Sequence, residues 1–340
     1  MDSVGDRLRG TVETLMDANL SDRELERAVD VLRRGGLVAF PTETVYGLGA
    51  DASNPAAVKK IFQAKGRPAD HPLIVHLPGS DALAEWAVEV TDVALGLASR
   101  FWPGPLTLIL RRQPNVPLAV TGGLETVALR VPDHPVALAL LRQFGGGIAA
   151  PSANRFGAVS PTRAEHVRSE LGSAVDFVLD GGPCRVGVES TIVDLSSGAP
   201  MLLRPGGITR EQLEDTVGEI SEPNAEQRVR APGQHASHYA PKARVYLVEA
   251  SSIPDEARRL IDRGLRVGVL LPPGEPEDNV AGSYSLRVPE SMEEYGARLY
   301  QMLRRFDEER CDAILASLPD ERDIGLAIAD RLRRAARIGC

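Results

Sequence analysis

The chain has 340 residues, 43% of them hydrophobic and 25% charged, which is the composition of a globular protein long enough for two domains. A formal net charge of -8 argues against general binding of long nucleic acids and favours small-molecule partners, although a local basic cleft is compatible with it. The three cysteines lie far apart and suggest neither disulfides nor a zinc site. The sequence contains no apolar run of about 20 residues and no signal peptide, so we expect a cytoplasmic protein with no membrane contact.

The N-terminal pattern predicts a leader followed by a helix. Residues 1–20 are weakly patterned, and we expect them to form a loose leader. Ser21 and Glu24 have the spacing of a capping box, and one apolar helical face follows them as far as Gly35. This helix opens the first predicted domain, residues 21–216.

A buried strand then leads directly into a loop of polar side chains. The strand is the apolar run 37–40, which Pro41 ends. The loop places two hydroxyls, a carboxylate and a phenol on Thr42, Glu43, Thr44 and Tyr46. We expect Gly47 and Gly49 to let the backbone turn tightly behind them. Loops after buried strands often carry functional sites, and an ordinary polar turn is the alternative.

A second helix and a cationic loop come next. Asn54 followed by Pro55 predicts a helix start, and the helix extends to about Phe62. We expect Lys65 and Arg67 to project from one loop rather than to lie along a helix face. A lysine point charge beside the bidentate fork of an arginine suits a polyphosphate, and a solvated basic loop is the alternative.

Alternating strands and helices fill the rest of the first domain. Further strands are predicted at residues 73–77, 106–110, 127–131, 147–150, 175–179, 191–195 and 201–204. Helices are predicted within residues 81–101 and at 135–144 and 162–171, the last opened by a capping box of Thr162 and Glu165. This alternation indicates an α/β fold with a twisted mixed sheet.

A linker and a second domain follow. Residues 217–243 contain several prolines and little apolar periodicity, which is typical of a linker. Residues 244–340 predict a smaller, Rossmann-like α/β domain. Its strands are predicted at 244–249, 266–271, 284–288 and 312–316, and its helices at 255–263, 290–309 and 323–337.

Polar side chains interrupt or end several of the apolar strands. His76 and Arg130 lie inside strands, Ser190 precedes one and Arg204 ends another. A buried arginine needs an anionic partner, which is either a protein carboxylate or a ligand. If these strand ends converge, they form one anion-binding cleft, although each residue alone has a structural alternative and a lone strand histidine is more often a core residue.

Two familiar nucleotide-binding motifs are not present. No GxxxxGK[ST] string occurs, which excludes a Walker-type phosphate loop. Residues 47–52 match G-x-G-x-x-A but do not open a helix directly, as a dinucleotide-binding fingerprint must.

Taken together, the short motifs of the chain are specific. In chain order they are PTETVYGLGADA, KGRP with HPLIVH, FWPGPLTLIL, LRVP, APSAN with SPT, ESTIVD, LRPG and PGQHASHYAP. Residues 21–243 thereby resemble the YrdC-type threonylcarbamoyl-AMP synthases. Residues 244–340, with their ending GLAIADRLRRAA, resemble the extra C-terminal domain of the long form of that family.

The resemblance implies an adenylate-forming reaction. L-threonine, bicarbonate and ATP would give threonylcarbamoyl-AMP and pyrophosphate, the first step of the N6-threonylcarbamoyladenosine (t6A) modification of tRNA. By the same resemblance, threonine would be held by Thr44, His76, Arg130, the backbone of Ala150, and Ser190. ATP would be held by Arg67, His71, Thr126, Ser152, Ser160, Arg204 and Tyr239. Lys65 and Arg67 would be the catalytic residues, with Lys65 as the electrostatic partner of the phosphates.

The resemblance also implies a cofactor and partners. Mg²⁺ would bind mainly through the ATP phosphates, with no metal site built from protein side chains. Transient contact with tRNA or with the downstream threonylcarbamoyl transferase is possible, and the linker 217–243 would act as a lid in which Tyr239 covers the nucleotide. The chain departs from the family at His71, where asparagine is most often expected, so the role of this residue could depend on pH.

Two other functions remain open on the sequence alone. The first is an RNA-binding module without nucleotide turnover, against which stand the net charge and the lack of RNP-like aromatic residues. The second is a nucleotide-binding or regulatory role for residues 244–340. Their opening, VYLVEASS, has no glycine-rich phosphate loop, which favours a role in docking and anchoring the lid.

Overall fold

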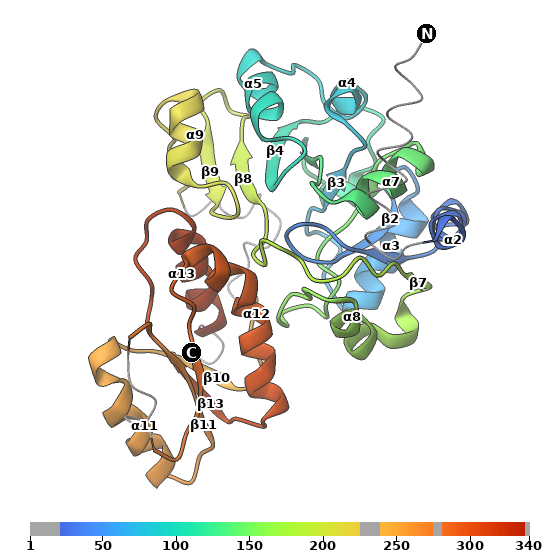
Figure 1. Cartoon of the computed structure of the whole chain (residues 1–340). Coiled ribbons are helices and arrows are strands. Elements are labelled where there is room, and N and C mark those ends of the chain that lie inside the picture. Colours follow the sequence, from blue (N-terminus) through green and yellow to red (C-terminus); the bar gives the residue numbers. More distant parts are fainter. Residues whose placement is uncertain (1–20, 225–238, 275–280, 337–340) are drawn as a thin grey trace. The chain divides into compact units, whose positions relative to one another are not determined.

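The structure is a computed structural model that describes residues 21–224, 239–274 and 281–336 (Figure 1). The expected leader and most of the expected linker lie outside these residues. Contacts divide the described residues into two compact units: the first unit holds residues 21–156, 161–185 and 189–224, and the second unit holds residues 157–160, 186–188, 239–274 and 281–336. No helix in the described part of the chain is both long and apolar enough to cross a membrane.

A nine-stranded mixed sheet forms the centre of the first unit. Its strand order is β7-β1-β2-β6-β3-β5-β4-β8-β9, and it contains both parallel and antiparallel pairs, as predicted. The strands are β1 (Val38–Phe40), β2 (Gly47–Asp51), β3 (Ile74–His76), β4 (Leu106–Arg111), β5 (Thr126–Arg130), β6 (Ile148–Ala149), β7 (Phe177–Val178), β8 (Thr191–Asp194) and β9 (Met201–Arg204). Most strand residues are buried, because apolar clusters cover both faces of the sheet.

Helices surround this sheet. They are α2 (Asp22–Arg33), α3 (Pro55–Lys65), α4 (Leu83–Trp86), α5 (Asp92–Phe101), α6 (Leu118–Thr121), α7 (Pro135–Phe144), α8 (Ala164–Leu171) and α9 (Arg210–Val217), with short 3-10 turns η1 (Ser80–Ala82) and η2 (Gly172–Ala174). Of these helices, α2, α3, α5, α7 and α9 begin with a side-chain cap. The capping box of Ser21 and Glu24 is present, as predicted. Helix α7 matches its predicted bounds, with proline at its first position and Gly145 left-handed at its end.

Three local predictions were wrong, and two short helices, α6 and α9, were missed. The residues expected to turn tightly, Gly47 and Gly49, lie in β2, where neighbouring strands leave no room for a side chain at Gly49: an added Cβ would come within 2.8 Å of Ile148 and Phe40. Helix α3 extends to Lys65, so Lys65 does not lie in the loop with Arg67. Helix α8 begins after Arg163 without a side-chain cap, so the second predicted capping box does not form.

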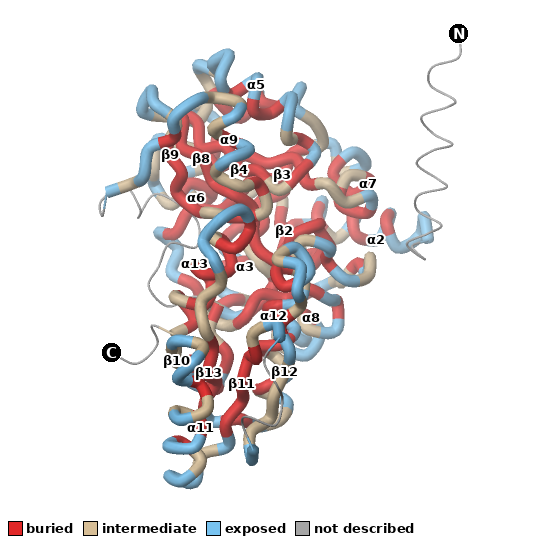
Figure 2. The backbone as a smooth tube through the Cα atoms, turned by 60° about the vertical axis from the view of Figure 1, so that its left-hand side comes forward, coloured by how far each residue is buried: buried red, intermediate tan, exposed pale blue. Residues whose placement is uncertain are grey.

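The second unit contains a four-stranded parallel sheet in the order β10-β13-β11-β12. Its elements are β10 (Arg244–Leu247), η3 (Ala250–Ser252), α11 (Ile253–Asp262), β11 (Val267–Leu271), β12 (Tyr284–Arg287), α12 (Met292–Glu308), β13 (Ala313–Ala316) and α13 (Ile324–Ala336). Strands β11 and β13 are buried throughout, whereas much of α11 is exposed (Figure 2). Parallel strands joined by helices confirm the predicted Rossmann-like character.

Candidate active site

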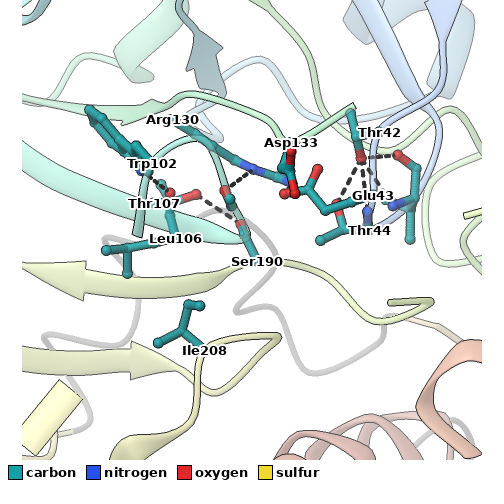
Figure 3. A network of polar contacts seen from close by, with 12 residues as sticks. Thr42, Glu43, Thr44, Trp102, Leu106, Thr107, Arg130, Asp133, Ser190 and Ile208 are labelled. Carbon is teal, nitrogen blue, oxygen red and sulfur yellow. Dashed lines mark hydrogen bonds and ion pairs between the residues drawn. The ribbon is translucent and has the colours of Figure 1, made fainter. Parts of the chain in front are cut away.

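Thr42 organises the loop that follows β1. Its hydroxyl donates to the carbonyl of Val45 at 2.6 Å and accepts the backbone N–H groups of Thr44 and Val45 at 3.2 Å. The hydroxyls of Thr42 and Thr44 are 2.8 Å apart, as Figure 3 shows. The hydrogen of Thr42 is directed at Val45 and both of its lone pairs accept backbone N–H groups, so the hydrogen-bonding capacity of Thr42 is used within this loop.

A buried ion pair lies beside this loop. Glu43 Oε1 is 2.8 Å from Arg130 Nη2, and both side chains are almost fully buried. Arg130 also donates through Nε to the carbonyl of Gly104 at 3.3 Å (Figure 3). Glu43 Oε2 has no hydrogen-bond partner within the described residues. The carboxylate balances the arginine charge, and the guanidinium retains N–H groups that can bind an additional anion.

His76 lies next to Arg130 in the sheet. The two residues are register partners in the parallel pair of β3 and β5, and the imidazole meets the Phe40 ring edge-on at 5.8 Å between centroids. Burial and the positive charge of Arg130 lower the pKa of His76 to about 3. The imidazole is therefore neutral at physiological pH, when it has one donor and one acceptor nitrogen.

Ser190 is fixed from several sides. Its hydroxyl lies 2.8 Å from the Thr107 hydroxyl, on β4, and accepts a hydrogen bond from Arg204 Nη2 at 3.1 Å. Arg204 also donates through Nε to the carbonyl of Ser190 at 3.0 Å. A Cβ added to Gly206 would come within 2.3 to 2.5 Å of backbone atoms of residues 189–191, so the loop after β9 packs directly on the Ser190 backbone.

Lys65 holds the loop that follows β6. Its ammonium group donates to the carbonyls of Ser152 and Asn154, each at 2.5 Å. Burial and the nearby charge of Arg67 lower the pKa of Lys65 well below its usual value. The side chain is 2% exposed, so Lys65 lies inside the unit rather than on a solvated basic loop.

Arg67 and His71 lie close to this lysine in the sequence and are also buried. Arg67 Nη2 donates to the carbonyl of Pro72 at 2.9 Å, and the His71 ring lies 5.5 Å from that of Phe156. Ala150 donates its backbone N–H to Ile74 at 2.9 Å, which joins the end of β6 to β3. The loop that Lys65 holds follows β6, and Arg130 lies on β5; these two strands flank β3 in the same sheet.

Three further site residues were predicted, one in the first unit and two in the second. Thr126, at the opposite end of β5 from Arg130, lines an open cavity of about 500 Å³ with Arg111, Arg112 and Glu125. Ser160 and Tyr239 belong to the second unit. Within it, the Tyr239 ring stacks on Tyr300 at 5.8 Å, and the Arg331 guanidinium lies 5.1 Å from the centre of the Tyr239 ring.

Sequence reasoning missed the parts played by Glu43 and Thr107. Glu43 was noted as a polar loop residue, but its pairing with Arg130 depends on contact between segments 87 residues apart. Thr107 is the one polar residue in the buried run 106–110. A polar residue at such a position needs a hydrogen-bond partner, and that requirement was the available signal.

Comparisons with known proteins cover nearly the whole chain. Residues 30–206 match the Sua5/YciO/YrdC family model, described as "Telomere recombination", and residues 208–337 match "Threonylcarbamoyl-AMP synthase, C-terminal domain". The threonylcarbamoyl-AMP synthase of Bacillus subtilis is 45% identical over 96% of this chain and 97% of its own length, and that of Pyrococcus abyssi is 43% identical over 93% and 95%.

A solved structure is equally similar. The crystal structure of P. abyssi Sua5 in complex with L-threonine superimposes with a TM-score of 0.89 at 42% identity and covers 93% of this chain and 95% of that chain. A double variant of the same P. abyssi protein gives a TM-score of 0.86, covering 92% of each chain.

Proposed function

The chain belongs to the Sua5/YrdC family of threonylcarbamoyl-AMP synthases, and from this premise we propose that it converts L-threonine, bicarbonate and ATP into threonylcarbamoyl-AMP and pyrophosphate. The product is the donor for t6A modification of tRNA. A cytoplasmic location and transient contact with tRNA or the downstream threonylcarbamoyl transferase are parts of this proposal.

The buried ion pair of Arg130 and Glu43, beside a neutral His76, is the observation that carries the proposal. An amino acid presents a carboxylate, and Arg130 offers a charge-assisted donor whose own charge Glu43 already balances. Neutral His76 suits an uncharged hydroxyl better than a second anion. We assign threonine to these two residues together with Thr44, Ala150 and Ser190, and the related P. abyssi protein has been crystallised with L-threonine.

Three cationic side chains of the first unit suit the phosphates of ATP. Arg67 and Arg204 bring planar guanidinium groups, and Lys65 fixes the loop that contains Ser152. We propose that these residues, with His71, hold the nucleotide; the roles of Thr126, Ser160 and Tyr239 in ATP binding stay predictions from the family resemblance. In this proposal Mg²⁺ arrives on the ATP phosphates as part of the substrate, so Lys65 and Arg67 supply the positive charge from the protein.

The reaction requires no covalent enzyme intermediate. The threonine amine adds to carbon dioxide with loss of a proton, or condenses with bicarbonate with loss of water, to form a carbamate. A carbamate oxygen then bonds to the α-phosphorus of ATP as the bond from that phosphorus to the bridging oxygen breaks and pyrophosphate leaves. The residues of the site hold two anions together and stabilise the charge that develops on the phosphates. Their burial keeps water from a labile carbamate.

The test is pyrophosphate release with product detection by mass spectrometry. We expect release to require L-threonine, bicarbonate and ATP together, and Arg130→Met to reduce threonine-dependent release by at least about 100-fold, because loss of a buried charge partner costs about 3 kcal/mol or more. Arg168→Met is the matched control, since Arg168 forms only a half-exposed pair with Asp180. Release that is indifferent to threonine, or salt-sensitive RNA binding without turnover, would overturn the proposal.

A further inference from the structure

Thr107 is a buried threonine whose hydroxyl contacts the hydroxyl of Ser190. It lies on β4, is fully buried, and is 2.8 Å from Ser190 Oγ. Within the described part of the chain, the Thr107 hydroxyl has no hydrogen-bond partner other than Ser190. A buried hydroxyl inside an apolar strand costs free energy unless its bonds are made, so its position needs a reason.

Counting hydrogen bonds gives the direction of this contact. Each hydroxyl has one hydrogen and two lone pairs, and Ser190 Oγ already accepts from Arg204 Nη2. If Thr107 donates to Ser190, both Ser190 lone pairs are used and the Ser190 hydrogen is available to a ligand. If Ser190 donates instead, the buried Thr107 hydrogen has no acceptor among the described residues, and that hydrogen bond is lost.

Only the first arrangement satisfies every group when an anion is bound. A carboxylate or carbamate oxygen accepts hydrogen bonds and cannot donate them. It therefore accepts a hydrogen bond from the Ser190 hydroxyl, while the two lone pairs of Ser190 Oγ accept hydrogen bonds from Thr107 and Arg204. We propose that Thr107 is a positioning residue that fixes the Ser190 hydroxyl as a donor to an anionic oxygen of bound threonine or its carbamate.

The surroundings of Ser190 support this role. The Thr191 hydroxyl donates to the carbonyl of Ile208 at 2.6 Å and accepts its N–H at 2.9 Å, so the backbone on one side is held. Gly206 packs against the same backbone. The backbone contacts hold the main chain, and the hydrogen bond from Arg204 holds Ser190 Oγ, so the rotation of the hydroxyl hydrogen remains, and Thr107 restricts that rotation.

The inference rests on the proposed function, and the experiment separates the two. Thr107→Val keeps the side-chain shape but removes the donor. We expect it to raise the KM and Kd for L-threonine about 10-fold, the effect of one hydrogen bond to a charged group, with the KM for ATP unchanged. Thr107→Ser, which restores the hydroxyl, should stay within about twofold of wild type, and Thr107→Cys, with a weak donor, should fall between.

A double-mutant cycle excludes a merely structural effect. In a Ser190→Ala background, Thr107→Val should change threonine affinity less than about twofold, because the group it orients is gone. Thr216→Val, which removes a hydroxyl bonded to the Gln212 carbonyl on α9, controls for general loss of stability. Circular dichroism reports whether each variant folds. If Thr107→Val does not fold, the inference is tested by comparing the Kd for threonine of Thr107→Cys, which should be higher, with that of Thr107→Ser.

Two outcomes would overturn the inference: a wild-type Kd for threonine in Thr107→Val, or a full 10-fold loss that persists in the Ser190→Ala background. A wild-type enzyme without threonine-dependent turnover would instead reject the proposed function. The inference therefore fails separately from the function on which it rests.

Discussion

At the scale of single residues, the candidate site owes its properties to burial. His76 and Lys65 are both nearly inaccessible, and burial lowers the pKa of each. The sequence placed a histidine and an arginine inside apolar strands and predicted a charge partner for the arginine. It could not identify Glu43 as that partner, because the contact depends on how two distant segments pack together.

The pKa of His76 has a measurable consequence for stability. Its value in the folded chain is about 3, against about 6.5 in an unfolded one, so between these values the unfolded state binds a proton that the folded state does not. Stability therefore falls as the pH drops below about 6.5. At pH 5 the loss from His76 is about 2 kcal/mol relative to pH 7.5.

Urea unfolding at pH 5 and 7.5 checks this prediction. His76→Gln carries no titrating group at this position, so its free energy of unfolding should change about 2 kcal/mol less between the two pH values than that of wild type. Equal changes in the two proteins would show that His76 is not buried in its neutral form.

At the scale of elements, local signals explain what the sequence predicted and non-local contacts explain what it missed. Helices α2 and α7 were predicted because their caps use residues within a few positions of each end. Strand β2 was missed because its glycines carry no strand signal and it forms only by pairing with β1 and β6. The candidate site was predicted as a set of strand ends, but which ends lie together depends on the strand order.

The loop after β9 provides the prediction at this scale. Gly206→Ala would place a Cβ 2.3 Å from the carbonyl oxygen of Glu189 and 2.4 Å from the N–H nitrogen of Thr191, and backbone atoms cannot move aside as a flexible side chain can. We expect a loss of about 1 to 3 kcal/mol in the free energy of unfolding, together with weaker threonine binding as Ser190 shifts.

Gly96→Ala is the matched control for Gly206→Ala. Gly96 lies in α5 with nothing within 4 Å of an added Cβ. This substitution should stabilise the protein by about 0.5 to 1 kcal/mol and leave threonine binding unchanged. A Gly206→Ala protein that unfolds and binds threonine like wild type would contradict the close packing described here.

At the scale of the whole molecule, the two units do not follow the order of the sequence. The predicted boundary lay in the linker at 217–243, yet by its contacts the second unit also includes residues 157–160 and 186–188. Within that unit the N–H of Ala240 donates to the carbonyl of Gly157 at 3.0 Å, and Arg304 donates to the carbonyl of Val159. Composition alone could not show this, because it reveals linkers but not which loops pack where.

Gly187 tests how far this packing matters for the site. It has a φ of +74°, and an added Cβ would lie 2.4 Å from Ala297 Cα and from the carbonyl oxygen of Gly296 on α12. Gly187→Ala should therefore lower the free energy of unfolding by more than the roughly 1 to 2 kcal/mol that an alanine costs in the left-handed conformation. Because residue 187 lies three positions before Ser190, we also expect a higher KM for threonine.

Gly264→Ala separates backbone strain from contact in this experiment. Gly264 has a φ of +82° in the same unit, with nothing within 4 Å of an added Cβ. Gly264→Ala should therefore lower the free energy of unfolding only by the cost of a left-handed alanine, and leave the KM for threonine unchanged. Thermal unfolding and threonine titration of both variants provide the comparison. Equal losses in the free energy of unfolding would mean that the contact with α12 adds nothing to the cost of Gly187→Ala. A larger loss in Gly187→Ala, together with a higher KM for threonine, would mean that the packing of Gly187 on α12 affects Ser190 through the residues that connect them.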